Sequence, residues 1–114
     1  MWRDDALLLD ILDCSRHALE FSKGVDYKTF QKNAQLHSAV LHQLLIIGEA
    51  ASKTSEACRT KYPDLPWKEM IGLRNILIHE YFRVDLTRIW KVLQENLPAL
   101  VKRLESIVPP SESK

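Results

Sequence analysis

The chain has 114 residues, a length typical of a single domain with one modest hydrophobic core. Hydrophobic residues make up 46% and charged residues 27%, as in ordinary globular proteins, which argues against a disordered or a membrane protein. Sixteen basic residues against fifteen acidic ones leave a net charge of +1, so any contact with nucleic acid has to be local.

The amino-terminal residues lack the apolar core of a signal peptide, and no apolar run approaches the roughly 18 residues that span a bilayer. We therefore expect a cytoplasmic protein without membrane contact. Cys14 and Cys58 have no second cysteine at metal-binding or redox spacing, which favours two reduced thiols over a disulfide between them.

Helical spacing of apolar residues predicts a first helix from about Asp4 to Phe21, with acidic residues at its start and Gly24 just beyond its end. A second helix is expected to begin at Asp26 and to continue without a break to about Ser52. Its inward positions follow a heptad pattern: Tyr27, Phe30, Ala34, His37, Leu41, Leu44, Gly48 and Ala51. At about 1.5 Å per residue this helix is roughly 40 Å long and forms the spine of a bundle.

Small residues around Gly48 in the last turns of this helix allow another backbone to approach closely, and a loop that contains Pro63 and Pro66 follows. A third helix is expected to begin near Pro66 and Trp67, because proline is well tolerated in a first turn.

A fourth helix is expected to begin at Asp85, with an apolar stripe from Leu86 to Ile107 and a kink at Pro98. The sequence thus predicts one all-α domain over residues 1–108, an antiparallel four- to five-helix bundle, and a disordered tail over 109–114.

Polar and apolar residues mix from Gly72 to Asp85, at the end of the third predicted helix. On a helix of about 100° per residue, Asn75 and His79 share one stripe, and Arg74 and Tyr81 share another. Both stripes are separate from the apolar face. One guanidinium, one amide, one imidazole and one phenol are therefore expected on the exposed side of one helix.

These groups suit phosphodiester chemistry. Arginine binds phosphate through two hydrogen bonds and stabilises a pentacovalent transition state, and histidine exchanges protons near neutral pH. RNA can be cleaved without a metal when the ribose 2′-hydroxyl attacks its own phosphate. The alternative is that Arg74 and His79 are solvated or paired with carboxylates, such as Glu69 or Glu80.

Arg74 and Asn75, followed by His79 and Tyr81, resemble the R-X4-6-H-X-Y motif of HEPN domains. The flanking sequence is similar to the HepT subgroup of these domains. The similar segments are Ile47–Ala51, Trp67 and Met70 before the motif, and Tyr81–Asp85 after the histidine. The resemblance covers most of the chain, roughly from Asp5 to Leu104.

The resemblance implies a homodimer whose two motifs meet in a cleft that cleaves RNA without a metal or another cofactor. It also implies a toxin–antitoxin pair, in which the partner is a minimal nucleotidyltransferase that uses ATP to attach AMP to the motif tyrosine, here Tyr81. Carried onto this sequence, Arg74 holds the scissile phosphate, His79 is the general acid or base, and Asn75 orients one of them or donates to a phosphate oxygen. Two plainer roles stay open, because Asn75 could brace the dimer and Tyr81 could pack at its edge.

Other candidates are weaker. Glu49 is expected to face the dimer cleft as a supporting residue or to act only in the interface, and His37 to be a packed or interface histidine. His17 and His42 have no partners at ligand spacing, so we predict no zinc site. A further basic group could extend an RNA track or form a solvated surface: Arg59, Lys61, Arg83, Arg88 and Lys91.

Two functions therefore compete. Intact Arg74, His79 and Tyr81 favour a ribonuclease toxin. The near-zero net charge slightly favours a catalytically inactive HEPN-like scaffold that binds a nucleotide or a partner protein.

Overall fold

The computed structural model describes residues 3–108, and the part of the chain that it describes contains helices and no strands. The predicted tail, residues 109–114, lies outside the described residues. The prediction of an all-α fold is confirmed. No helix within residues 3–108 is long and apolar enough to cross a membrane.

The first helix, α1, spans Asp4–Ser22, close to its predicted limits. Gly24 then turns the chain with a φ of +74°, a conformation that other residues rarely adopt. The prediction of one continuous helix from Asp26 is wrong, because the chain breaks at Asn33 into α2 (Tyr27–Lys32) and α3 (Ala34–Lys53). The Asn33 side chain accepts a hydrogen bond from the Leu36 N–H, 3.0 Å away, and so caps a new helix.

This break moves Ala34 to the surface, although the heptad pattern placed it inside. The predicted loop after α3 also contains a short helix, α4 (Glu56–Lys61), which Ser55 caps. The Asp4 carboxylate accepts hydrogen bonds from the Ser55 N–H and hydroxyl, at 2.9 and 2.6 Å, and so joins the starts of α1 and α4.

The helix α5 spans Trp67–His79 and begins where the sequence predicts. A short 3₁₀ turn, η1 (Tyr81–Arg83), leads to α6 (Leu86–Lys91), which Asp85 caps as expected. Five residues of π-helix, η2 (Val92–Asn96), join α6 to α7 (Leu97–Glu105). The kink expected at Pro98 is thus a π-helical turn just before it. Proline has no N–H to donate to the helix, which fits a disturbed helix at this point.

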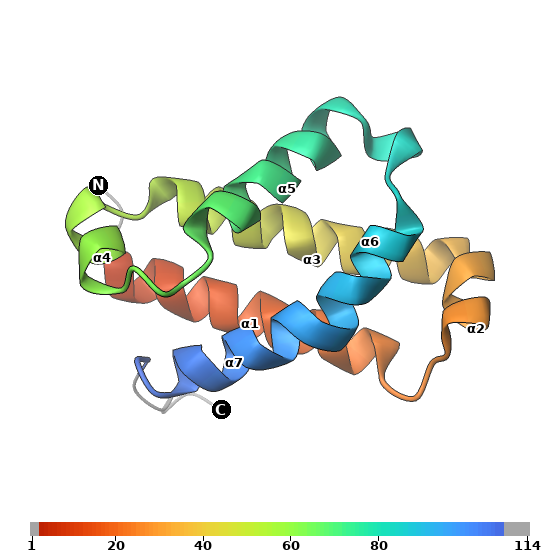
Figure 1. Cartoon of the computed structure of the whole chain (residues 1–114), viewed down its shortest axis with the longest axis horizontal. Coiled ribbons are helices and arrows are strands. Elements are labelled where there is room, and N and C mark those ends of the chain that lie inside the picture. Colours follow the sequence, from red (N-terminus) through yellow and green to blue (C-terminus); the bar gives the residue numbers. More distant parts are fainter. Residues whose placement is uncertain (1–2, 109–114) are drawn as a thin grey trace.

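The helices pack around α3, which lies between α1 on one side and α5 on the other (Figure 1). α7 packs against α1, and α2 against α3. The largest fully buried side chains include Ile11 of α1, Phe30 of α2, Val40 of α3, Ile89 of α6 and Leu104 of α7. This arrangement holds α5, the helix of the polar motif, at the outside of the bundle.

Candidate active site

Three motif residues lie on α5, and the helix separates them from the core. Leu73 and Leu77 are buried, whereas Asn75 and His79 are exposed. Arg74 lies between these two environments, with a side chain that is 20% exposed. α5 therefore presents two polar groups to solvent and holds a third close to the neighbouring helix.

Gly48 on α3 allows α5 to come close at this point. A Cβ atom at position 48 would lie 2.2 Å from the Arg74 Cβ and 2.7 Å from the Met70 carbonyl oxygen. Both distances are shorter than real contacts allow, so only glycine fits between the helices here. The close approach that the small residues predict is confirmed.

The residue after Gly48 is the ion-pair partner of Arg74. Glu49 accepts a short hydrogen bond from the Arg74 Nη1. Arg74 Nε is buried and has no hydrogen-bond partner within the described residues. Arg74 is thus paired with Glu49 from α3, and not with Glu69 or Glu80, the two carboxylates nearest to it in the sequence.

Tyr81 does not lie on the helical stripe that the sequence predicts. α5 ends at His79, and Glu80 leaves the helix with φ −138° and ψ 41° while its N–H still bonds to the Ile76 carbonyl, 2.7 Å away. Tyr81 follows in η1, where its ring meets Phe82 edge-on with centroids 5.3 Å apart. The prediction that Tyr81 and Arg74 share one stripe of a helix is therefore wrong, because the helix ends between them.

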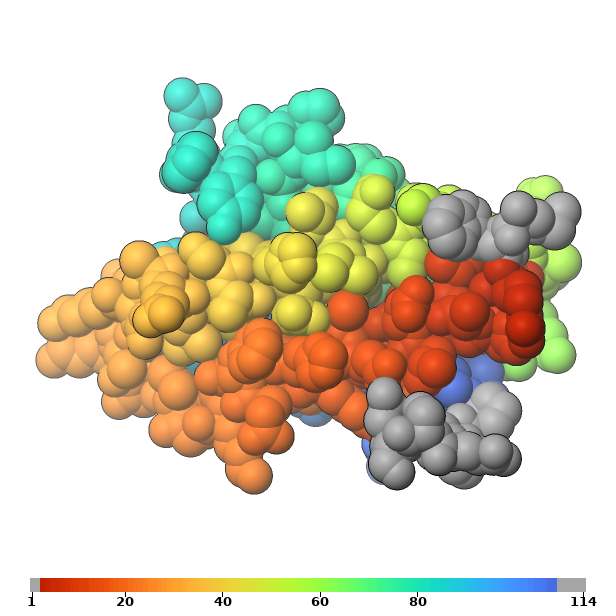
Figure 2. Space-filling model, turned by 180° about the vertical axis from the view of Figure 1, so that it is seen from behind, coloured from red at the N-terminus to blue at the C-terminus, as the bar shows by residue number. Residues whose placement is uncertain are grey.

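Exposed apolar side chains lie close to His79 in the sequence. Ile78 is 53% exposed, Tyr81 38% and Phe82 96%. Figure 2 shows the end of α5 and the following turn standing out from the body of the molecule above α3. Sequence reasoning missed Ile78 and Phe82. The available signal was that Ile78 is apolar at a position off the core face of the helix.

A family model described as ribonuclease HepT-like matches residues 11–107. The chain belongs to this HepT-like family. "Putative RNase MJ1380" of Methanocaldococcus jannaschii is 44% identical over 102 residues, which cover 90% of this chain and 94% of that protein. "Probable ribonuclease HepT" of Thermococcus cleftensis is 33% identical over 100 residues, which cover 88% and 91%. No solved structure matches the chain significantly.

Membership in the HepT-like family confirms the resemblance drawn from the motif and its flanking residues. The predicted enzyme class, a ribonuclease, is confirmed at the level of the family. The roles assigned to Arg74, Asn75, His79, Glu49 and Tyr81 stay predictions.

Two of the weaker candidates in the HepT-like chain, His37 and Arg59, have structural contacts. His37 is half-buried, with its Nε2 at the Phe30 carbonyl and its ring 5.0 Å from the Phe30 ring, so its predicted packed role is confirmed. The Arg59 guanidinium donates to the carbonyls of Ala51 and Ser52 at 3.0 Å and so closes the end of α3. Arg59 is therefore occupied and does not extend an RNA track.

Cys14 and Cys58 are both buried and free, so the preference for two separate thiols is confirmed. Within residues 3–108 no group of three or more His, Cys, Asp or Glu side chains is placed to hold a metal ion.

Proposed function

We propose that this HepT-like chain is a metal-independent endoribonuclease that acts as a toxin. The observation that carries the proposal is the arrangement on α5, where Glu49 holds Arg74 and His79 stands exposed less than two turns further along. An ion-paired guanidinium and an exposed imidazole on the same helix provide the two functions that RNA transesterification needs: charge stabilisation and proton transfer.

In the proposed reaction the ribose 2′-hydroxyl gives its proton to a base, and its oxygen attacks the adjacent phosphorus. The bond from phosphorus to the 5′-oxygen breaks, and that oxygen takes up a proton from an acid. The products are a 2′,3′-cyclic phosphate and a 5′-hydroxyl. Arg74 donates to the phosphate oxygens, Asn75 orients the phosphate or the imidazole, and His79 moves a proton. The nucleophile is part of the substrate, so the reaction needs no metal-bound water.

The proposed active unit is a homodimer. The reaction needs both a base and an acid, and each chain contributes one motif histidine, so two chains together supply both. Ile78, Tyr81 and Phe82, all close to His79 in the sequence, are exposed apolar side chains that a second copy would cover. In this dimer Glu49 keeps Arg74 directed toward the shared cleft.

We further propose that a minimal nucleotidyltransferase antitoxin inhibits the ribonuclease. The Tyr81 phenol oxygen attacks the α-phosphorus of ATP, pyrophosphate leaves, and the phenol proton passes to a base of the partner. The result is AMP joined to Tyr81. Support for this step comes from the partial exposure of Tyr81 in the turn just after His79. An attached AMP adds a negative phosphate and a bulky base beside the cleft, and both oppose the binding of RNA.

The proposal is tested by incubating purified chain with mixed cellular RNA in the presence of a chelator. We expect wild type to cleave, and Arg74→Ala and His79→Ala each to lose on the order of 10²-fold or more in rate. His42→Ala, an exposed histidine on α3 outside the motif, is the matched control and should cleave normally. Circular dichroism should show equal helix content in all four proteins. Folded motif variants that cleave at the wild-type rate would refute the assignment, and a requirement for magnesium would refute the metal-free mechanism.

A further inference from the structure

Positive charge is concentrated in two short segments, although the whole chain carries only +1. Residues 21–33 and 81–94 together contain six lysines and arginines and two carboxylates, whereas the rest of the chain contains ten and thirteen. The two segments therefore carry a net charge of +4, and the remainder carries −3. The near-zero total, which by itself slightly favours a scaffold over an RNA enzyme, is thus the sum of two unlike parts.

The two segments lie side by side in the fold. The Tyr27 hydroxyl on α2 is 3.1 Å from the Thr87 hydroxyl on α6, and the Trp90 ring packs against Tyr27 and Phe30, with centroids 5.7 and 5.2 Å apart. Figure 1 shows α2 and α6 at the end of the bundle where α5 gives way to η1. This end follows directly from the candidate active site, since η1 begins two residues after His79.

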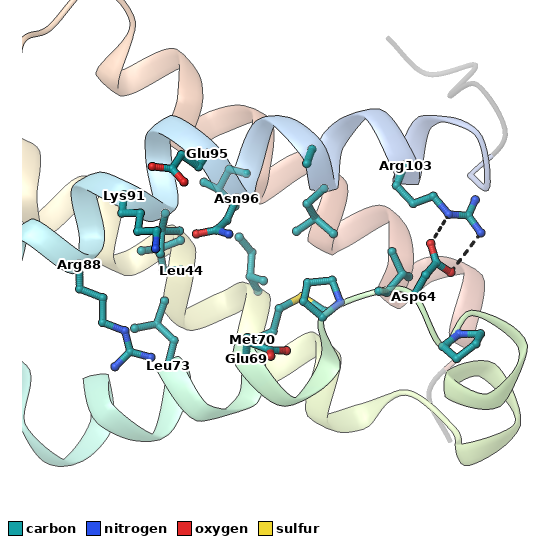
Figure 3. Close-up of a pocket in the computed structure, with 18 residues that line it drawn as sticks. Leu44, Asp64, Glu69, Met70, Leu73, Arg88, Lys91, Glu95, Asn96 and Arg103 are labelled. Atoms are coloured by element: carbon teal, nitrogen blue, oxygen red, sulfur yellow. Dashed lines mark hydrogen bonds and ion pairs between the residues drawn. The ribbon is translucent and has the colours of Figure 1, made fainter.

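Glutamates border both segments and offset some of their cations. Glu20, Glu80 and Glu95 lie within four residues of the cations at the borders, which are Lys23, Arg83 and Lys91. Figure 3 shows Glu95 on the helical turn beyond Lys91, and Arg88 reaching from α6 toward α5 instead. The cations away from these borders are Lys28 and Lys32 on α2 and Arg88 on α6.

These three cations are available to an anionic ligand. All three are exposed, and none of them pairs with a carboxylate within residues 3–108. Asp26 and Asp85, the two carboxylates of the segments, accept hydrogen bonds from backbone N–H groups as helix caps. Lys28 and Lys32 are one turn apart on the same face of α2, where like charges repel. An anion bound to both lysines would remove this repulsion.

We propose that Lys28, Lys32 and Arg88 form a phosphate-binding surface for the RNA that flanks the cleavage site. This inference rests on the proposed action on RNA. A strand whose scissile phosphate lies at Arg74 and His79 would leave the end of α5, cross α6 and reach α2, so that the three cations contact its backbone. Contacts of this kind position a nucleic acid and do not read its sequence.

The composition of the surface favours a polyanion over a partner protein. The exposed side chains of α2 and α6 are all polar, and the large exposed apolar side chains of the described residues belong to other elements. Protein interfaces have an apolar or aromatic centre, whereas phosphate contacts come from lysine, arginine, threonine and glutamine side chains. Thr29, Gln31 and Thr87 add such uncharged groups to the three cations.

The test measures RNA binding without cleavage. The parent protein is the full chain with His79→Ala, and the probe is a short, fluorescently labelled single-stranded RNA in the presence of a chelator. Fluorescence anisotropy at several salt concentrations gives the Kd and its salt dependence. Lys28→Gln with Lys32→Gln should weaken binding on the order of tenfold at about 0.1 M salt. The slope of log K against log salt should fall by about 1.4, since each phosphate contact on a single strand contributes about 0.7.

Adding Arg88→Gln should weaken binding further and lower the slope by about another 0.7. Lys68→Gln with Lys102→Gln is the matched control, because it also removes two charges from exposed helix positions, on α5 and α7. The control should bind within about twofold of the parent and keep its slope. Circular dichroism and light scattering should show that every variant keeps the fold and oligomeric state of the parent.

The proposal would be overturned by an α2 double variant that binds like the control, by a control that weakens binding equally, or by no further loss with Arg88→Gln. Tighter binding of poly-glutamate than of RNA would also overturn it, because the surface would then serve an acidic protein. Binding and cleavage are read separately. Loss of binding in a protein that never cleaves RNA would uphold this surface and refute the ribonuclease, whereas normal cleavage with unchanged binding would do the reverse.

Discussion

Arg74, to which we assign an active-site role, is a largely buried side chain. Its side chain is only 20% exposed, and an arginine so placed needs a carboxylate partner because an unpaired charge is costly to bury. Glu49 engages Nη1 alone, and the buried Nε has no partner within the described residues. Nη2 also has no hydrogen-bond partner within residues 3–108, so Nη2, and not the buried Nε, is the donor that would bind a phosphate in the proposed reaction.

Tyr81 provides the sharpest test of the proposed inhibition by AMPylation. We predict that chain co-expressed with its nucleotidyltransferase antitoxin gains mass in multiples of AMP, because the phenol is partly exposed and follows directly after the active-site helix. Peptide mass spectrometry should map the added mass to Tyr81.

Tyr81→Phe keeps the ring that packs against Phe82 and removes the oxygen that would accept AMP. We expect this variant to stay unmodified and to remain toxic beside the antitoxin. A Tyr81→Phe protein that the antitoxin still neutralises fully would show that the antitoxin acts by covering the cleft.

Cys14 supplies a prediction about thiol reactivity. Burial, together with the nearby Asp10 and Asp13 carboxylates, raises the pKa of the Cys14 thiol to about 11. The thiolate is the reactive form, so near pH 8 the folded thiol should react with iodoacetamide on the order of 10²-fold more slowly than the same thiol in denaturant. Reactivity of the folded protein should appear only as the pH rises toward that pKa. Time-resolved mass spectrometry checks this, and equal rates with and without denaturant would contradict it.

At the scale of the elements, helix starts were easier to predict than helix breaks. Asp85 and Pro66 mark helix starts with ordinary local signals, and both predicted starts are confirmed. Asn33 is a common capping residue, but the apolar heptad pattern continues across it from Phe30 to His37, and the prediction of a continuous helix followed that pattern. Glu80 ends α5 without a glycine, so the sequence offered no sign that Tyr81 would leave the helix.

The contact between α3 and α5 supports a prediction with an internal control. Gly48→Ala places a Cβ 2.7 Å from the Met70 carbonyl, and because a backbone atom cannot move aside, α5 has to shift. We expect a loss of about 1–3 kcal/mol in the free energy of unfolding and a fall in cleavage rate, since Arg74 moves with α5.

Gly72→Ala is the matched control. Position 72 lies inside α5, the helix that packs against Gly48, and a Cβ there meets no atom within 4 Å. This variant should gain up to about 1 kcal/mol, because alanine favours a helix interior more than glycine does. Thermal or denaturant unfolding measures both changes, and a Gly48→Ala protein as stable as wild type would contradict the packing described here.

At the scale of the whole molecule, we predict a homodimer built on the surface around His79. Light scattering coupled to gel filtration should give twice the mass of the chain at micromolar concentration. Phe82→Asp should yield monomers and abolish cleavage, because it puts a charge on the most exposed aromatic ring of the described part. Phe21→Asp, at the end of α1, is the control for loss of an exposed aromatic ring elsewhere on the surface. This variant should remain dimeric. A monomeric wild type that cleaves RNA would contradict the shared cleft.

The motif and the bundle class could be predicted from the sequence because both depend on local spacing: Arg74 to His79 along one helix, and apolar stripes along the others. The partner of Arg74 could not be predicted with the same certainty, because Glu49 is 25 residues away and reaches it only after α3 and α5 have crossed.

The neighbouring positions of Gly48 and Glu49 have a genetic consequence. The glycine that sets the distance between α3 and α5 adjoins the carboxylate that holds Arg74, so damage to one disturbs the other. Consider a selection for cells that survive expression of this chain. Survivors with a substitution at position 48 should contain little of the variant protein, because it is misfolded and sensitive to proteases. Substitutions at the exposed position 79 should be recovered at normal abundance. Immunoblots of the survivors would thus distinguish alleles that lose the fold from alleles that lose only the chemistry.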